Sequence, residues 1–274
     1  MTPRSWLFVP GHSARMMEKA RDAGADALIL DLEDAVAPDE KRAARATVAG
    51  FLADKPALPC FVRVNALETG MTAEDVTAVR DGADGFVLPK CEGRSDIAAL
   101  AGMTGEAPIL AIATETARGV RALMAEDWSH PALMGLAWGA EDLAADLGAS
   151  ANRDGSGRYL SPFRLARDAM LFAARAARVA AIDAVHTDFR DAAGLAAEAR
   201  EAEVLGFSAK LAIHPAQIGP IHEAFTPSPE RVAWARRVVE AMSGGRGVAS
   251  LDGQMLDRPH LRQAEAILER AVEA

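Results

Sequence analysis

Short runs of apolar residues alternate with longer amphipathic stretches over most of the chain. Eight apolar runs have the length of buried strands. They are residues 6–9, 27–32, 60–64, 85–89, 109–114, 133–138, 181–185 and 210–214. The stretches between them, such as residues 13–25, place apolar residues three and four positions apart among Ala, Arg and Glu, which is typical of helices.

This alternation predicts an α/β fold whose parallel sheet is covered by helices. Eight β-α units favour a closed (β/α)8 TIM barrel, and an open sheet of six strands is the alternative if two of the runs are not strands. After residue 225 the pattern changes to amphipathic helical segments interrupted by the glycine-rich stretch 243–247. We therefore expect a barrel catalytic domain at residues 1–225 and a C-terminal helical extension at residues 226–274.

The composition argues against several classes of protein. The chain has 274 residues, 50% of them hydrophobic, and a formal net charge of −9 with no basic stretch, which argues against a nucleic-acid-binding protein. Cys60 and Cys91 are its only cysteines, so no disulfide framework is expected and a reducing compartment is favoured. The apolar run near the start is too short for a signal peptide or a membrane span. These features predict a cytoplasmic protein that does not bind membranes.

Polar residues follow the predicted strands, at the end where barrel enzymes carry their chemistry. They are Glu33, Asp34, Arg63, Asn65, Lys90, Glu115, Glu141, Asp142, His186, Asp188 and His214. Glu115 and Asp142 follow the fifth and sixth strands, and neighbouring strands lie about 5 Å apart. Both carboxylates can therefore converge on a hard cation such as Mg²⁺. Alternatively, each carboxylate caps the helix that follows it.

Basic residues end the third and fourth strands. Arg63 at this position can polarise a carbonyl group or clamp a carboxylate. It can also form an internal ion pair with Glu33 or Asp34. Lys90 can form a Schiff base with a carbonyl substrate. Its acidic surroundings would raise its pKa, so an ion pair is favoured for Lys90.

Eight segments carry motifs that occur together, in order, over nearly the whole chain. They are RSWLFVPG, DALILDLEDAVAPDEKRAAR, FVRVNAL, DGFVLPK, ATETARG, GAEDLAADLG, GFSAKLAIHPAQI and LDGQMLDRPHLRQA. Together these segments resemble the citrate lyase β-subunit family of the wider HpcH/HpaI aldolase group, which also includes malyl-CoA lyases, citramalyl-CoA lyases and malyl-CoA thioesterases.

The resemblance implies a role for residues at several strand ends. Glu115 and Asp142 correspond to the Mg²⁺ ligands of the family. Arg63 corresponds to the arginine that binds the substrate carbonyl oxygen. The amide groups around Ala140 and Glu141 would receive the substrate carboxylate at the start of a helix.

The resemblance also implies contacts outside this group. Arg15 and Lys19 lie near the positions where family members meet the phosphates of CoA. Asp257 corresponds to a catalytic carboxylate supplied by the neighbouring subunit, within a homotrimer or a hexamer. Glu33 and Asp34 stand where related aldolases carry Glu-His, so the histidine base of those relatives is absent.

The resemblance implies a Mg²⁺-dependent lyase that cleaves a short 3-hydroxyacyl-CoA, of the malyl-CoA or citramalyl-CoA type, into an acyl-CoA and a 2-oxo acid. A malyl-CoA thioesterase, a citryl carrier-protein lyase and a non-catalytic barrel that binds a CoA ester or a 2-oxo acid are the alternatives. Residues 152–164 and His186 depart from the family pattern and leave the substrate undecided.

Overall fold

A closed barrel of eight parallel strands forms within the described part of the chain, which in this computed structural model covers residues 3–243 and 247–273. The strands are β1 (Ser5–Pro10), β2 (Ala27–Asp31), β3 (Cys60–Arg63), β4 (Gly85–Leu88), β5 (Ile109–Ile112), β6 (Leu133–Ala137), β7 (Ala180–Asp183) and β8 (Ala209–Ala212). Pairing of β1 with β8 closes the sheet. The predicted (β/α)8 barrel is thus confirmed, and the six-stranded alternative is wrong.

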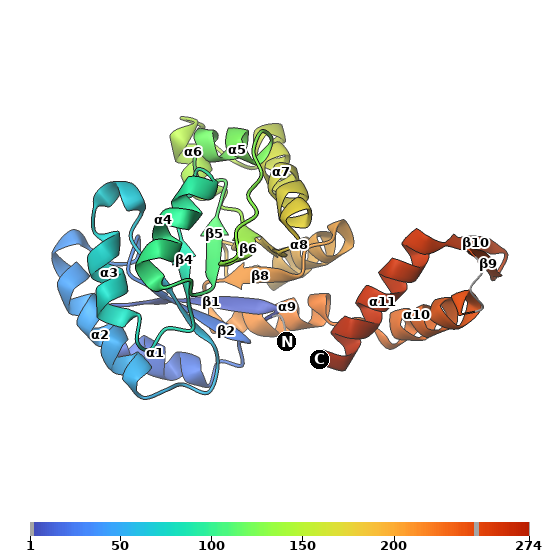
Figure 1. The fold of residues 1–274 in the computed structure, drawn as a ribbon, viewed down its shortest axis with the longest axis horizontal. Helices are drawn as coiled ribbons and strands as arrows, with labels where there is room; N and C mark the ends of the chain where they lie inside the picture. The colour runs from blue at the N-terminus through green and yellow to red at the C-terminus, as the bar shows by residue number, and fades with distance from the viewer. Residues whose placement is uncertain (1–2, 244–246, 274) are drawn as a thin grey trace. The chain divides into compact units, whose positions relative to one another are not determined.

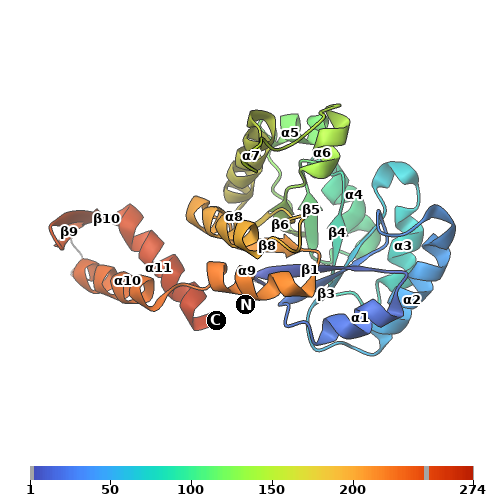
Figure 2. The ribbon, with the colours of Figure 1, turned by 180° about the vertical axis from the view of Figure 1, so that it is seen from behind.

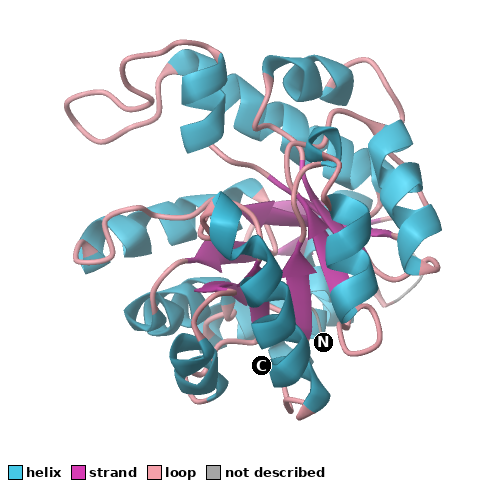
Figure 3. Ribbon diagram, turned by 90° about the vertical axis from the view of Figure 1, so that its left-hand side faces the viewer, coloured by secondary structure: helices cyan, strands magenta, loops and turns pink. Residues whose placement is uncertain are grey.

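Helices surround the strands, as Figures 1 and 3 show. They are α1 (Ala14–Arg21), α2 (Lys41–Ala53), α3 (Thr72–Val79), α4 (Arg94–Thr104), α5 (Ala117–Leu123), α6 (Glu141–Asp146), α7 (Ser161–Ala177), α8 (Ala192–Leu205) and α9 (Ile218–Phe225), with short 3-10 turns at η1 (Pro38–Glu40), η2 (Leu67–Thr69) and η3 (Pro215–Gln217). Ser13, Thr116 and Asp191 cap their helices through side-chain oxygens. Across the described residues, no helix combines the length and the apolar character that crossing a membrane requires.

The interior of the barrel is filled by apolar side chains. Its buried core consists of Trp6, Ala27, Ile29, Phe61, Val87, Leu110, Ile112, Ala137, Ile182, Ala209 and Leu211. Trp6 packs edge-on against Phe61, with ring centroids 4.9 Å apart. In barrels of this kind the chemistry lies where the strands end, beyond the packed interior.

The chain divides between Ile221 and His222 into two compact units of described structure. The C-terminal unit contains α10 (Pro229–Met242), β9 (Val248–Leu251), β10 (Gln254–Asp257) and α11 (Arg258–Glu273). Figures 1 and 2 show α10 and α11 side by side, and Val238, Leu256 and Ile267 are buried in their shared core. Residues 244–246 of the predicted glycine-rich joint lie outside the described residues.

The C-terminal unit includes an antiparallel hairpin in addition to the expected helices. Strand β9 pairs with β10, with Leu251 opposite Gln254. Asp252 and Gly253 form the turn with φ values of 52° and 80°. Positive φ at both central residues is what a tight two-residue hairpin requires, and Asp-Gly is a favoured pair for it.

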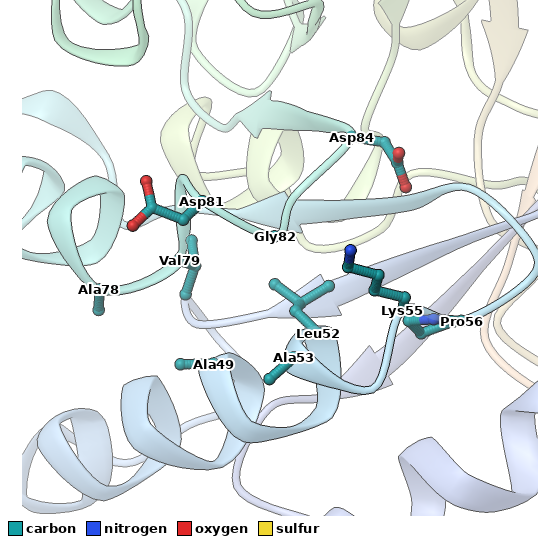
Figure 4. A pocket seen from close by; sticks show the side chains of 10 residues that line it. All are labelled: Ala49, Leu52, Ala53, Lys55, Pro56, Ala78, Val79, Asp81, Gly82 and Asp84. Carbon is teal, nitrogen blue, oxygen red and sulfur yellow. The ribbon is translucent and has the colours of Figure 1, made fainter.

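A surface cavity of about 490 Å³ lies at the end of the barrel where the strands begin. Figure 4 shows its walls, which come from the last turns of α2 and α3 and from the segments that follow them. Its charged side chains are Lys55, Asp81 and Asp84. None of the predicted site residues lines this cavity, so the candidate site must be sought at the opposite rim.

Packing around the first residue of β4 generates a prediction about stability. A Cβ atom added to Gly85 would lie 2.2 Å from Cε1 of Phe61 and 2.6 Å from the carbonyl oxygen of Pro108. We therefore expect Gly85→Ala to lower the free energy of unfolding by about 2 kcal/mol. Urea denaturation measures this, with Gly50→Ala as the matched control.

Gly50 is exposed on α2, and a Cβ atom there meets nothing within 4 Å. Alanine is the better helix former, so Gly50→Ala should be neutral or stabilising by up to about 1 kcal/mol. A Gly85→Ala protein as stable as the wild type would contradict this account of the barrel packing.

Candidate active site

Charged side chains gather at the rim of the barrel where the parallel strands end. Asp31 is the last residue of β2 and Arg63 the last residue of β3, and the pairing of these strands places the two residues opposite each other. Lys90 and Glu115 follow β4 and β5, and Asp142 lies in the first turn of α6. Strands that run in parallel carry these residues to one rim, as the barrel prediction requires.

Arg63 is held by two carboxylates. Its Nε and Nη2 atoms donate to Oδ1 and Oδ2 of Asp31 at 2.7 and 2.6 Å, and its Nη1 lies 2.9 Å from Oε2 of Glu33. Burial alone would raise the pKa of Asp31, but the charge and hydrogen bonds of Arg63 bring that pKa below its usual value. The predicted ion pair with Glu33 is present, and the bidentate pair with Asp31 is an addition that no sequence motif indicated.

Lys90 occupies the next position along the rim. Its ammonium group pairs with Oε1 of Glu33 and lies 3.4 Å from Oδ1 of Asp142 and 3.7 Å from Oδ2 of Asp34. Burial would lower the pKa of Lys90, but Glu33 and the other carboxylates raise it above its ordinary value. Lys90 therefore remains a cation, which suits the expected ion pair and opposes Schiff-base chemistry.

Glu115 is buried, with 4% of its surface exposed. Burial, and next the negative charge of Asp142, raise its pKa to about 8. One carboxylate oxygen accepts a hydrogen bond from the backbone N–H of Lys90. The hydroxyl of Thr114 accepts a bond from the N–H of Gly139 at 3.0 Å, which locks together the loops that carry Glu115 and Asp142.

The donor set suits Mg²⁺. Among the described residues, no three His, Cys, Asp or Glu side chains are grouped as a complete metal cage. Glu115 and Asp142 instead offer two carboxylates within electrostatic reach of each other. Mg²⁺ commonly takes one or two carboxylates and completes its shell with water and substrate oxygens. A divalent cation would also relieve the burial and repulsion that disfavour ionised Glu115.

The other residues with a predicted role lie on α6, on α1 and in the C-terminal unit. Ala140 is the N-cap of α6 and Glu141 its first residue. Arg15 and Lys19 are exposed on α1, one turn apart, with Arg15 nearer the rim at the end of β1. Asp257 ends β10 in the C-terminal unit and is therefore not part of the barrel.

His260 accompanies Asp257 in the C-terminal unit. Its Nδ1 atom lies 2.6 Å from Oδ1 of Asp257, three residues earlier in the chain. Both side chains are partly exposed, at 42% and 37%. The pair fixes the carboxylate of Asp257 near the start of α11, and His260 carried no predicted role.

A second polar network lies where β7 and β8 meet. Asp183 is buried and accepts hydrogen bonds from Nε1 of Trp138 at 2.7 Å, from Nε of Arg167 at 3.1 Å and from Nζ of Lys210 at 2.6 Å. Burial would raise the pKa of Asp183, but Lys210 and Arg167 bring it below its usual value. Because each carboxylate oxygen has a cationic partner, this network is electrostatically satisfied.

Glu198 of α8 contacts both His186 and the segment 152–164, which are the two features that depart from the family pattern. Its Oε2 atom lies 3.1 Å from Nδ1 of His186, and its Oε1 atom pairs with Arg153 from the segment 152–164. Burial would raise the pKa of Glu198, but His186, Lys210 and Arg153 lower it to about 2. No sequence signal singled out Glu198, because it lies in the middle of an ordinary amphipathic helix.

The segment 152–164 also reaches the start of α6. Nδ2 of Asn152 donates to Oε1 of Glu141 at 2.8 Å. The guanidinium of Arg153 lies 3.7 Å from the ring centroid of Tyr159, and Tyr159 packs edge-on against Trp138. The segment thus connects the helix that carries Asp142 with the wall formed by β7 and α8.

Comparisons with known proteins show the family to which the chain is similar. Residues 4–215 match the family model described as HpcH/HpaI aldolase/citrate lyase, and residues 162–273 match one described as a C-C bond lyase of the TIM-barrel fold. A citrate lyase subunit beta-like protein of Mycobacterium tuberculosis (strain CDC 1551 / Oshkosh) is 42% identical over 272 residues, which cover 98% of this chain and 96% of the relative.

Two further comparisons extend this picture. A (3S)-malyl-CoA thioesterase of Cereibacter sphaeroides (strain KD131 / KCTC 12085) is 39% identical over 279 residues, which cover 98% of this chain and 94% of the relative. The crystal structure of protein CitE from Mycobacterium tuberculosis, in complex with magnesium, acetoacetate and coenzyme A, is similar with a TM-score of 0.84 and 41% identity, and the match covers 98% of both chains.

The raised pKa of Glu115 generates a prediction about pH. Folded Glu115 stays protonated up to about pH 8, whereas the unfolded residue ionises near its ordinary value of 4.5. Unfolding therefore releases a proton between these values, and Glu115 makes stability fall as pH rises through that window, by at most about 1.4 kcal/mol per pH unit. Chemical denaturation in chelator from pH 5 to 8 should show this fall in the wild type and a smaller one in Glu115→Gln. Exposed Glu126→Gln is the control, and an equal fall in all three proteins would contradict the prediction.

Proposed function

The chain belongs to the HpcH/HpaI aldolase/citrate lyase family, and on that premise we propose that it is a Mg²⁺-dependent carbon–carbon lyase. Its substrate is a short 3-hydroxyacyl-CoA of the malyl-CoA or citramalyl-CoA type, which is cleaved to an acyl-CoA and a 2-oxo acid. One observation carries the proposal. Glu115 and Asp142 share one part of the rim, and Arg63 lies close enough for its charge to affect Glu115.

Residues of the rim supply the electrostatics of this reaction. Glu115 and Asp142 would hold Mg²⁺, which when bound supplies a Lewis acid for the carboxylate and carbonyl oxygens of a 2-oxo acid. Arg63 stabilises the negative charge that develops on the carbonyl oxygen. Its bidentate pair with Asp31 fixes the plane of the guanidinium before substrate binds, so little reorganisation is needed.

The other substrate groups meet residues around the rim. The amide groups near Ala140 and Glu141, at the start of α6, would receive the carboxylate of the 2-oxo acid. Arg15 and Lys19 are exposed cations on α1 and would meet the CoA phosphates. These assignments follow the family pattern and the position of each residue in this chain.

We propose that Asp257 completes the site of a neighbouring subunit in a homotrimer or hexamer. Asp257 would exchange a proton with the methyl carbon of the acyl-CoA. It belongs to the C-terminal unit, and His260 fixes its carboxylate at 2.6 Å. On this proposal residues 1–225 form the catalytic barrel, and residues 226–274 serve the adjacent protomer.

Hydrolysis of malyl-CoA is the second candidate function. It is favoured by the 39% identity to a protein named (3S)-malyl-CoA thioesterase. The same carboxylates would hold the metal, and a water molecule would attack the thioester instead of the carbon–carbon bond breaking. A citryl carrier-protein lyase would share the cleavage step but require a carrier protein. A non-catalytic binding barrel has no need of a proton-transfer carboxylate such as Asp257.

Product analysis tests the proposed reaction. The protein is incubated with malyl-CoA, citramalyl-CoA and citryl-CoA in Mg²⁺, and products are separated by mass. A 2-oxo acid with an acyl-CoA is expected, whereas free hydroxy acid with CoA would establish hydrolysis. Glu115→Ala and Asp142→Ala should each lower turnover at least about a thousandfold, because each removes a metal ligand. Activity of either variant in chelator would contradict the metal assignment.

Subunit complementation tests the role of Asp257. Asp257→Ala and Arg63→Ala chains, each inactive, are dissociated, mixed and reassembled. If one site uses both residues from different chains, random mixing restores about a quarter of the sites. Asp142→Ala replaces Arg63→Ala as the barrel variant if loss of Arg63, which leaves Asp31 buried and unpaired, prevents folding. Inactive assemblies that demonstrably contain both chains would assign the C-terminal unit a structural role.

A further inference from the structure

Lys90 contacts both carboxylates that the proposed function assigns to the metal. Its ammonium group lies 3.4 Å from Oδ1 of Asp142. Its backbone N–H donates to Oε2 of Glu115. The two contacts come from chemically different parts of the residue, because one depends on the side-chain charge and the other persists whatever the side chain.

The backbone of Lys90 makes this double contact possible. Its φ is 50°, in the left-handed region that residues with a side chain rarely adopt. In this conformation the amide faces Glu115 while the side chain reaches Glu33, Asp34 and Asp142. Such backbone strain in a rim loop persists only where surrounding contacts hold it. The bond from the backbone N–H to Glu115 is one such contact, and it does not require the ammonium group.

The positive charge of the Lys90 ammonium group is poorly screened by solvent and salt. Its side chain is 26% exposed, and Glu33, its shortest partner, is 7% exposed. Charges that are partly buried are screened by salt less than those on the surface. A divalent cation held by Asp142 would therefore experience strong repulsion from an ammonium group that approaches the same carboxylate.

We infer that Lys90 sets the Mg²⁺ affinity of the proposed site, because its side chain competes with the cation for Asp142 while its backbone amide orients Glu115. The inference rests on the proposed function. Lys90 can keep its bond to Glu33 when it yields Asp142, so metal binding need not leave the ammonium group without a partner. Lys90 thereby keeps the Mg²⁺ affinity moderate. Its bond to Glu33 also balances the negative charge of that carboxylate, which leaves the positive charge of Arg63 less fully offset and able to bind substrate.

The alternative role for Lys90 is purely structural. A residue that only neutralises Glu33 would stabilise the rim without affecting the metal. Its removal would then leave Mg²⁺ affinity unchanged, or weaken it by loosening the carboxylates. The inference predicts the opposite sign, since removal of a competing positive charge strengthens cation binding.

Calorimetric titration of Mg²⁺ into the metal-stripped full-length protein, at fixed ionic strength, separates these roles. Lys90→Met keeps most of the side-chain length and the backbone amide but removes the charge, and its Kd for Mg²⁺ should fall at least about fivefold. Lys90→Arg keeps the charge and should stay within about twofold of the wild type. Lys55→Met is the matched control, because Lys55 is exposed at the other end of the barrel and also has a φ of 50°.

Two further measurements keep the test decisive. If Lys90→Met does not fold, Lys90→Gln replaces it, and Mg²⁺ should raise the Tm of the variant more than that of the wild type. Unchanged or weaker binding in a folded variant overturns the inference about Lys90 alone, provided that Glu115→Ala abolishes binding. Binding that survives in Glu115→Ala places the metal elsewhere and overturns both the inference and the proposed metal site.

Discussion

Pairing of the first strand with the last is the constraint on which the site depends. Ser5, Trp6 and Leu7 of β1 pair with Lys210, Leu211 and Ala212 of β8, and this closes a sheet whose other strands are each paired in chain order. Closure removes both sheet edges and fixes all strand ends on one rim. The interior is then filled by apolar side chains, so charged groups at strand ends have the rim as their shared location.

Carboxyl groups near this rim have pKa values that are shifted in opposite directions. Asp183 is buried and Glu198 is partly buried, yet both pKa values lie below the usual range. Lys210 and Arg167 outweigh the effect of burial on Asp183, and His186, Lys210 and Arg153 outweigh it on Glu198. Glu115 is buried as Asp183 is, but burial, and next the negative charge of Asp142, raise its pKa to about 8. A carboxylate left in that condition is typical of a functional site, whereas the compensated ones hold the wall in place.

The rim and the C-terminal unit make different contributions to the proposed chemistry. Arg63 ends β3, Glu115 follows β5 and Asp142 lies in the first turn of α6. Positions on or beside regular elements suit groups that bind and polarise a substrate. Asp257 follows a hairpin strand in a separate compact unit, and His260 orients it. On the proposal, the barrel of one subunit would bind the substrate, and the C-terminal unit of a neighbouring subunit would supply the proton-transfer group.

Local sequence patterns were sufficient to predict the barrel, and they placed the candidate site residues after its strands. Apolar runs of strand length, separated by amphipathic stretches, predicted the closed eight-stranded barrel, and motifs at strand ends pointed to Arg63, Glu115 and Asp142. Those signals are local, because they depend on periodicity and on the residue that follows each run.

Only the tertiary structure determined which charged side chains contact one another. Asp31 reads as the end of an apolar run, and its pair with Arg63 depends on the pairing of β2 with β3. In the sequence Glu198 is one of many acidic helix residues. Its contact with His186 depends on how α8 packs against the loop that follows β7. The contacts of Lys90 with Glu115 and Asp142 depend on a positive φ that no sequence motif predicted. Strand pairing, side-chain direction and backbone strain are set by packing between segments distant in sequence, so local patterns cannot specify them.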